Sequence, residues 1–131
     1  MKLLLDTHAF LWFIGGDPQL TTYARQLIED PSNQRYVSIA SVWEITIKSS
    51  LGRLIVPAPP SRLISDHIWS NSIALLAISS EHLDVVHALP YHHKDPFDRL
   101  MIAQAIHEGM TLVSKDQAIT AYNLPVLWNA A

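Results

Sequence analysis

The sequence predicts an α/β fold, in which a mostly parallel β-sheet carries helices on both faces. The first observation is that short apolar runs of strand length alternate with longer segments of helical periodicity along the chain. The second is that runs such as residues 2–5 are apolar at successive positions, the pattern of a strand buried on both faces. The third is the length of 131 residues, which suffices for one domain with a substantial core. We therefore expect a single domain over residues 1–131.

Composition narrows the class of protein. The hydrophobic fraction of 49% and the charged fraction of 16% are typical of a compact folded chain. The sequence has no cysteine, which excludes disulfides and thiolate metal sites. A net charge of −3 argues against a polycation that coats nucleic acid, but not against a nucleic-acid enzyme whose metal ions supply positive charge. No apolar run approaches the roughly 20 residues of a membrane span, so we expect a cytoplasmic protein without a membrane partner.

The segments expected to form strands share a short, apolar or β-branched composition. They are residues 2–5, 35–40, 73–78, 111–114 and 125–128. The segments expected to form helices share helical apolar spacing and recognisable start or stop residues. They are residues 8–14, 22–30, 41–51, 61–71, 80–89 and 96–108. Residues 54–60 are rich in proline, so we expect an extended connection there, with a small strand as the alternative.

The last of these helices contains an unusual acid. Asp95 and Pro96 form a helix start, because an aspartate side chain accepts the first free N–H groups and proline fits the first helical position. The residues after them are apolar nearly all round, which predicts a buried helix. Asp98 shares a stripe with Ile102 and Ala105, and a buried carboxylate is costly unless a positive group meets it. The simpler alternative is that Asp98 caps the helix from its third position.

Three further acids stand at positions that lead to the same edge of the sheet. Asp6 directly follows the first expected strand, and Asp116 follows the fourth by two residues. The carboxyl ends of parallel strands meet at one edge, and helices that follow strands begin there. Glu44, like Asp98, lies on the inward face of such a helix near its start. We therefore expect Asp6, Glu44, Asp98 and Asp116 to converge on one pocket.

Each of these acids also has a local alternative. Glu44 completes an S-x-x-E capping box with Ser41. Asp6 can be read as a turn residue at a strand end, and Asp116 as the cap of a short helix that begins at Gln117. All four acids are expected at the same edge of the sheet, which favours a shared site over four separate local roles. Four carboxylates brought together without a counter-charge repel one another and raise one another's pKa values, so such a site needs a positive charge.

A hard divalent cation makes such a cluster tolerable, because Mg²⁺ binds carboxylate oxygens and keeps part of its water shell. The chemistry that follows is metal-assisted hydrolysis of a phosphodiester, with one or two ions. Thr7 and Ser114 each neighbour a site acid and are candidates to hold a water or a phosphate oxygen, with strand-end hydrogen bonding as the alternative. Arg99 and Lys115 are candidates for phosphate contact. For the loop 91–94 we expect a solvated loop, with help in holding phosphates near the pocket mouth as the alternative.

Four segments resemble the motifs of the PIN-domain ribonucleases, and most closely the VapC-type toxins of bacterial toxin–antitoxin pairs. They read L-L-L-D-T-H-A-F-L-W, S-V-W-E-I-T-I-K, H-K-D-P-F-D-R-L-M-I-A-Q-A and L-V-S-K-D, and they are spread in order from residue 3 to residue 116. The resemblance implies a PIN-like three-layer α/β/α sandwich with a twisted parallel sheet of four or five strands. It also implies that Asp6, Glu44, Asp98 and Asp116 are an acidic quartet that binds Mg²⁺ or Mn²⁺. Ser114 fills a hydroxyl position that is often threonine.

The same resemblance implies an activity and partners. It implies an endoribonuclease that prefers single-stranded RNA and commonly acts on structured RNAs such as tRNA. It also implies a homodimer and a cognate antitoxin protein that wraps the toxin and obstructs its pocket. The alternative from another class is a catalytically silent PIN-like module that only binds RNA or a protein partner. An aspartyl-phosphate enzyme is a weaker rival, because the residue two positions after Asp6 is His8 rather than a second acid.

Overall fold

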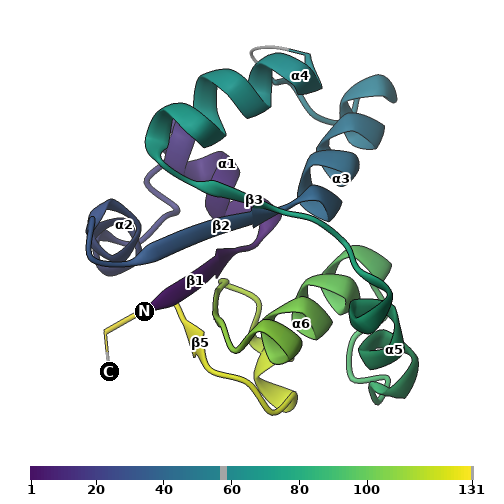
Figure 1. The fold of residues 1–131 in the computed structure, drawn as a ribbon. Helices are drawn as coiled ribbons and strands as arrows, with labels where there is room; N and C mark the ends of the chain where they lie inside the picture. The colour runs from purple at the N-terminus through teal and green to yellow at the C-terminus, as the bar shows by residue number, and fades with distance from the viewer. Residues whose placement is uncertain (57–58, 131) are drawn as a thin grey trace.

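The computed structural model describes residues 1–56 and 59–130, and Figure 1 shows its fold. A parallel sheet runs through the centre in the order β3-β2-β1-β4-β5. Its strands are β1 (Lys2–Leu5), β2 (Gln34–Ser38), β3 (Ala74–Leu76), β4 (Thr111–Val113) and β5 (Val126–Leu127). The predicted α/β class and parallel sheet are confirmed, and the sheet has five strands.

Helices connect these strands, and most begin at a capping side chain. The longer helices are α1 (Thr7–Gly15), α2 (Thr22–Glu29), α3 (Ile39–Ser50), α5 (Ser80–Ala88) and α6 (Pro96–Glu108). The short helix α4 (Pro60–Leu63) continues through a π turn, η1 (Ile64–Ile68), and a 3₁₀ turn, η2 (Trp69–Asn71). A last 3₁₀ helix, η3 (Gln117–Ala121), follows β4. No helix in the described part of the chain is long and apolar enough to cross a membrane.

The strand β1 is buried on both faces, which explains its uninterrupted apolar sequence. Leu3 and Leu5 pack into one cluster with side chains of α1, α2 and α3. Leu4 points the opposite way, into a second cluster with side chains of α6 and β4. Helices α5 and α6 lie on the other side of the sheet from α1 and α4 (Figure 1). This arrangement of two helix layers around a sheet is the predicted three-layer sandwich.

The strand order fixes where a ligand site can form. From β1 the chain builds β2 and β3 on one side, and β4 and β5 on the other. In parallel sheets a crevice opens at the carboxyl ends of the strands where the order reverses, here between β1 and β4. Asp6 follows β1 directly, and Asp116 follows β4 by three residues. The topology therefore places these two acids at the same crevice.

The start of α3 differs from the expectation. The strand expected over residues 35–40 ends at Ser38, whose hydroxyl accepts the Ala40 N–H (3.0 Å) and caps the helix. Ser41 lies inside the helix and is buried, so the predicted capping box between Ser41 and Glu44 is wrong. Two serines stand three residues apart in this run, and the earlier one forms the cap.

The connection or small strand expected at residues 54–60 can be compared with the structure at residues 54–56, 59 and 60. Residues 54–56 form no strand. The part of this prediction at residues 57–58 lies outside the described residues, and residues 59 and 60 form no strand, because Pro60 begins α4.

Candidate active site

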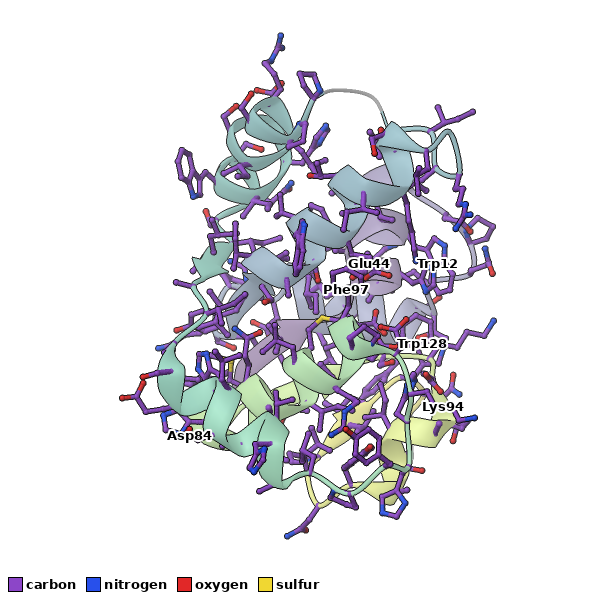
Figure 2. All side chains as sticks on the ribbon, turned by 90° about the vertical axis from the view of Figure 1, so that its right-hand side faces the viewer. Trp12, Glu44, Asp84, Lys94, Phe97 and Trp128 are labelled. Carbon is purple, nitrogen blue, oxygen red and sulfur yellow. The ribbon has the colours of Figure 1, made fainter. Side chains whose placement is uncertain are left out.

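A pocket of about 120 Å³ lies at the carboxyl ends of β1 and β4. Its lining comes from the starts of α1 and α6, from the middle of α3 and from the turn after β4. The lining residues are Asp6, Thr7, His8, Glu44, Lys48, Asp95, Asp98 and Asp116. Figure 2 shows Glu44 on α3 next to the start of α6, where Phe97 is labelled. The structure thus brings together all four acids that the sequence placed in one pocket.

Asp6 combines a capping role with a place in the pocket. Its carboxylate accepts the backbone N–H of Ala9 (2.8 Å) and so caps α1. Burial raises the pKa of Asp6 above its ordinary value, and the nearby charge of Asp116 adds to this. Hydrogen bonding from Ser114 and the charge of His8 oppose the shift. The position of the Asp6 carboxylate is therefore fixed, because the residue directly follows β1 and its side chain caps α1.

Glu44 is the most enclosed acid of the pocket. Its side chain is 5% exposed, yet each oxygen has a partner at 2.6 Å, the Thr7 hydroxyl on one and the Lys48 ammonium on the other. The Thr7 hydroxyl also lies 3.0 Å from the Ser41 hydroxyl. The Thr7 side chain therefore holds a site acid, and this buried carboxylate meets both a hydroxyl donor and a cation.

Asp98 does not cap α6. The capping side chain is Asp95, which accepts the N–H groups of Phe97 (2.8 Å) and Asp98 (3.1 Å). The N–H of Asp95 itself donates to His93, so the reciprocal bond of a capping box from Asp98 is absent from the described contacts. The alternative capping role predicted for Asp98 is therefore wrong.

The surroundings of Asp98 disfavour its charge. Burial is the main cause that raises the pKa of Asp98 to about 7, and the carboxylate of Asp95 is the next. The charges of Asp6 and Glu44 add to the shift, whereas His93 opposes it. Asp98 thus senses the other acids of the pocket, as the sequence predicted for converging carboxylates.

Asp116 is the more exposed acid. One of its oxygens accepts the Ala118 N–H (2.9 Å) and caps η3, and the other lies 2.7 Å from Nε2 of His93. Partial burial pushes the pKa of Asp116 upward, but the hydrogen bonds from His93 and Ala118 outweigh it, and the pKa lies below its ordinary value. The Ser114 hydroxyl accepts the N–H of Asp116 (3.1 Å), which is the strand-end hydrogen bonding given as the alternative for this residue.

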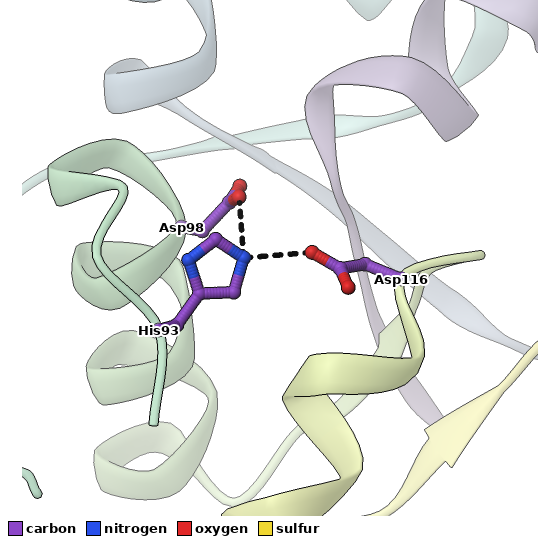
Figure 3. Close-up of side chains that lie close together, drawn as sticks. All are labelled: His93, Asp98 and Asp116. Atoms are coloured by element: carbon purple, nitrogen blue, oxygen red, sulfur yellow. Dashed lines mark hydrogen bonds and ion pairs between the residues drawn. The ribbon is translucent and has the colours of Figure 1, made fainter. Parts of the chain in front are cut away.

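His93 is the contact residue that sequence reasoning missed. Its Nε2 lies 2.7 Å from Asp116 and 3.2 Å from Asp98 (Figure 3). One ligand atom from each of these three residues lies within 4.8 Å of the others. The expected solvated loop is wrong for this side chain, which is only 14% exposed. The available signal was its place two residues before the helix cap Asp95, where a ring can fold back onto the helix start.

Two predicted phosphate contacts lie elsewhere. Arg99 is buried, and its guanidinium donates to the backbone carbonyls of Val86 (3.2 Å), Leu89 (3.3 Å) and Pro90 (2.9 Å). It ties the end of α5 and the loop before α6 to α6 and does not line the pocket, so the expected phosphate contact through Arg99 is wrong. Lys115 points to the Trp12 ring, 5.7 Å from its centroid, and does not line the pocket.

Comparison with known proteins identifies the family. The PIN domain family model matches residues 3–123. The chain belongs to the PIN domain family. The resemblance inferred from the four sequence motifs is thereby confirmed.

This PIN domain is 27% identical to Ribonuclease VapC22 of Mycobacterium tuberculosis (strain ATCC 25618 / H37Rv) over 124 residues, which cover 94% of this chain and 93% of that protein. Its fold is similar to that of VapBC2 from Rickettsia felis bound to a DNA fragment from their promoter, with a TM-score of 0.73, 18% identity and coverage of 98% and 100%. A toxin–antitoxin complex from Klebsiella pneumoniae gives a TM-score of 0.64, 18% identity and coverage of 95% of both chains. The solved structures establish the likeness of the fold.

The donor atoms of the pocket suit a hard divalent cation. Five carboxylic acids line it, and the pKa values of two of them, Asp6 and Asp98, are raised, so their charged forms lack sufficient compensation. Carboxylate oxygens are the ligands that Mg²⁺ and Mn²⁺ prefer, and the chain contains no thiol that would favour a softer metal. The residues of this PIN domain pocket therefore fit Mg²⁺ or Mn²⁺.

Proposed function

We propose that this PIN domain is a Mg²⁺- or Mn²⁺-dependent endoribonuclease that hydrolyses RNA phosphodiester bonds, and that it is the toxin of a toxin–antitoxin pair. The observation that carries the proposal is the single pocket lined by Asp6, Glu44, Asp98 and Asp116. The similarity to a protein named a ribonuclease over nearly the whole chain supports the same activity.

In this proposal the four acids bind the metal, and each is held by a different part of the fold. When bound, one or two ions activate a water and stabilise the charge that develops on the phosphate. Asp6 and Asp116 are fixed at the sheet edge by their caps, at the starts of α1 and η3. Glu44 is held in place by Thr7 and Lys48. The Lys48 side chain is 41% exposed, so its ammonium can also meet a phosphate oxygen of the RNA.

Neutralising a site acid without changing its shape tests the catalytic proposal. We expect Asp98→Asn and Asp6→Asn to reduce metal-dependent cleavage of a single-stranded RNA by more than about 100-fold, because each removes a metal ligand. The matched control is Asp84→Asn, since Asp84 is an exposed acid on α5 far from the pocket (Figure 2). Full cleavage by either site variant would contradict the proposal, whereas a lack of metal-dependent cleavage by the unmodified protein would favour the silent RNA-binding module.

The partner proposals rest on the solved relatives. The similar structures include VapBC2 and a toxin–antitoxin complex, so we propose that this chain acts in the cytoplasm, as a homodimer bound to a cognate antitoxin. Co-expression with the product of the adjacent reading frame should yield a copurifying complex and restore growth. Sequencing RNA 5′ ends after controlled expression would identify the substrate, for which a tRNA is the first expectation.

A further inference from the structure

We propose that His93 is a positioning residue of this site, whose Nε2–H group bridges the carboxylates of Asp98 and Asp116 and holds them ready for the cation. This proposal rests on the metal site of the proposed function. Its starting point is the pair of contacts in Figure 3, 2.7 Å to Asp116 and 3.2 Å to Asp98. Among the described residues, no other side chain is recorded in contact with both acids.

The hydrogen bonding of the ring fixes which nitrogen carries the proton. The backbone N–H of Asp95 donates to Nδ1 of His93 over 3.1 Å. A backbone N–H can only donate, so Nδ1 is an acceptor and carries no proton. Nε2 therefore carries the proton, and both of its carboxylate contacts are donor contacts. In this orientation Nε2 has no free lone pair, so His93 is a partner of the metal ligands and is not itself a ligand.

The ring is held in this orientation by the loop before α6. The His93 N–H donates to the Tyr122 hydroxyl (2.9 Å), which in turn donates to the Pro90 carbonyl (2.8 Å). Arg99 donates to the same carbonyl (2.9 Å), and its guanidinium lies 3.9 Å from the centroid of the Tyr91 ring. The loop is thus tied down at Pro90, at Tyr91 and at His93 itself, so the bridge is built into the fold.

The bridge opposes the repulsion between two acids that belong to different segments. Asp98 lies in the first turn of α6, whereas Asp116 follows β4, and no covalent feature keeps them close. Each carboxylate has about four lone-pair sites, so an oxygen that accepts the Nε2–H can still bind a cation. Side chains that hydrogen-bond to metal ligands typically contribute a factor of about 10–100 to metal affinity. We expect the same here.

Two substitutions of His93 distinguish the role of Nδ1 as an acceptor from the role of Nε2–H as a donor. In His93→Asn the side-chain oxygen can replace Nδ1 as acceptor for Asp95, but the shorter side chain does not reach the carboxylates. In His93→Gln the amide N–H can replace Nε2–H. We expect Mn²⁺ affinity, measured by calorimetry without RNA, to fall about tenfold in the Asn variant and to recover in part in the Gln variant. The control is His87→Asn, because His87 is an exposed histidine of α5.

A spectroscopic measurement keeps the test independent of activity. In long-range ¹H–¹⁵N spectra, we expect His93 to show a protonated Nε2 and an unprotonated Nδ1, both without metal and with saturating Mg²⁺. Loss of the Nε2 proton on Mg²⁺ binding would overturn the proposal, because the ring would then be a ligand. Unchanged or tighter Mn²⁺ binding by His93→Asn, or no Mn²⁺ binding by the unmodified protein, would also overturn it.

The outcome is distinguishable from that of the proposed ribonuclease activity. Weaker Mn²⁺ binding by His93→Asn, in a protein that cleaves no RNA, supports the positioning role and contradicts the ribonuclease. RNA cleavage that needs Asp98 but shows the same Mn²⁺ dependence in His93→Asn supports the ribonuclease and overturns the positioning role.

Discussion

The two sides of the acidic pocket compensate their charges in different ways. On the side of α3, Glu44 has a hydroxyl donor and a cation, each at 2.6 Å. On the side of α6, Asp98 has the His93 ring at 3.2 Å and otherwise faces Asp95, Asp6 and Glu44, and its pKa is raised to about 7. On the α3 side, partners within the chain compensate the negative charge. On the α6 side, an added positive charge is needed to compensate it. The difference predicts that the proposed metal ion compensates most negative charge where α6 begins.

The sharpest consequence of this difference is pH-dependent metal binding. Asp98 must lose its proton to bind a cation, and its pKa is about 7. Below that value, each unit of pH should lower Mn²⁺ affinity by up to tenfold, so we expect a loss of about 100-fold between about pH 7 and pH 5. Calorimetric titrations with Mn²⁺ across this range measure it directly. Affinity that stays constant would show that Asp98 is already ionised across this range without metal.

The α3 side can be broken by removing its cation. Lys48→Met leaves the carboxylate of Glu44 buried next to an apolar group, since the acid is 5% exposed. The full cost of an orphaned buried charge is reduced here because the Lys48 side chain is 41% exposed, so we expect a loss of about 1–2 kcal/mol in the free energy of unfolding. Urea unfolding measures the loss. Lys48→Arg keeps the charge and should recover most of the stability.

The α6 side should respond in the opposite sense. Asp98→Asn removes a charge that its surroundings disfavour, so the metal-free variant should be more stable than the unmodified protein at about pH 8, by about 1 kcal/mol. The raised pKa sets the direction with pH. Between the ordinary value of 3.8 and about 7, the folded state binds more protons than the unfolded state, so the stability of the unmodified protein falls as pH rises.

Melting temperatures in EDTA at about pH 4, 6 and 8 test this sign. The advantage of Asp98→Asn should be small at the lowest pH, grow through the middle of the range and level off above about pH 7. The control Asp84→Asn should show no such trend, because Asp84 is exposed. A variant that is less stable than the unmodified protein at every pH would mean that Asp98 supports the fold through a contact other than its charge.

The sequence predicted the acids better than it predicted what holds them. Asp6 and Asp116 could be placed together because the end of a buried strand is visible as an abrupt change from apolar to acidic residues. The cap of α6 could be placed because Asp95 and Pro96 are neighbours in the chain. Such signals lie within a few neighbouring residues. Parallel pairing of the strands then brings the acids that follow them to the same edge of the sheet.

The errors concern residues whose partners are distant in the sequence. His93 contacts Asp116, 23 residues away, and its loop is held by Tyr122, 29 residues away. Arg99 was expected near phosphate, but its guanidinium donates to backbone carbonyls of α5 and of the loop before α6, and no sequence periodicity encodes that choice. Ser38 rather than Ser41 caps α3 because the end of β2 depends on its pairing with β3. These contacts follow from tertiary packing, which a single sequence does not display.

The smallest effect should come from the hydroxyl that holds Glu44. Thr7→Val keeps the β-branched shape but removes the donor at 2.6 Å from the buried carboxylate. Because Lys48 still compensates the charge, we expect a loss of only about 1 kcal/mol in the free energy of unfolding, below the about 1.5–3 kcal/mol typical of a hydrogen bond to a charged group. Thr7→Ser retains a hydroxyl and should lose less stability.

The double variant Thr7→Val with Lys48→Met should lose more stability than the sum of the losses in the two single variants, because each partner still compensates Glu44 when the other is removed. Simple additivity would mean that the two contacts act on Glu44 independently, and that the α3 side is less cooperative than its geometry indicates.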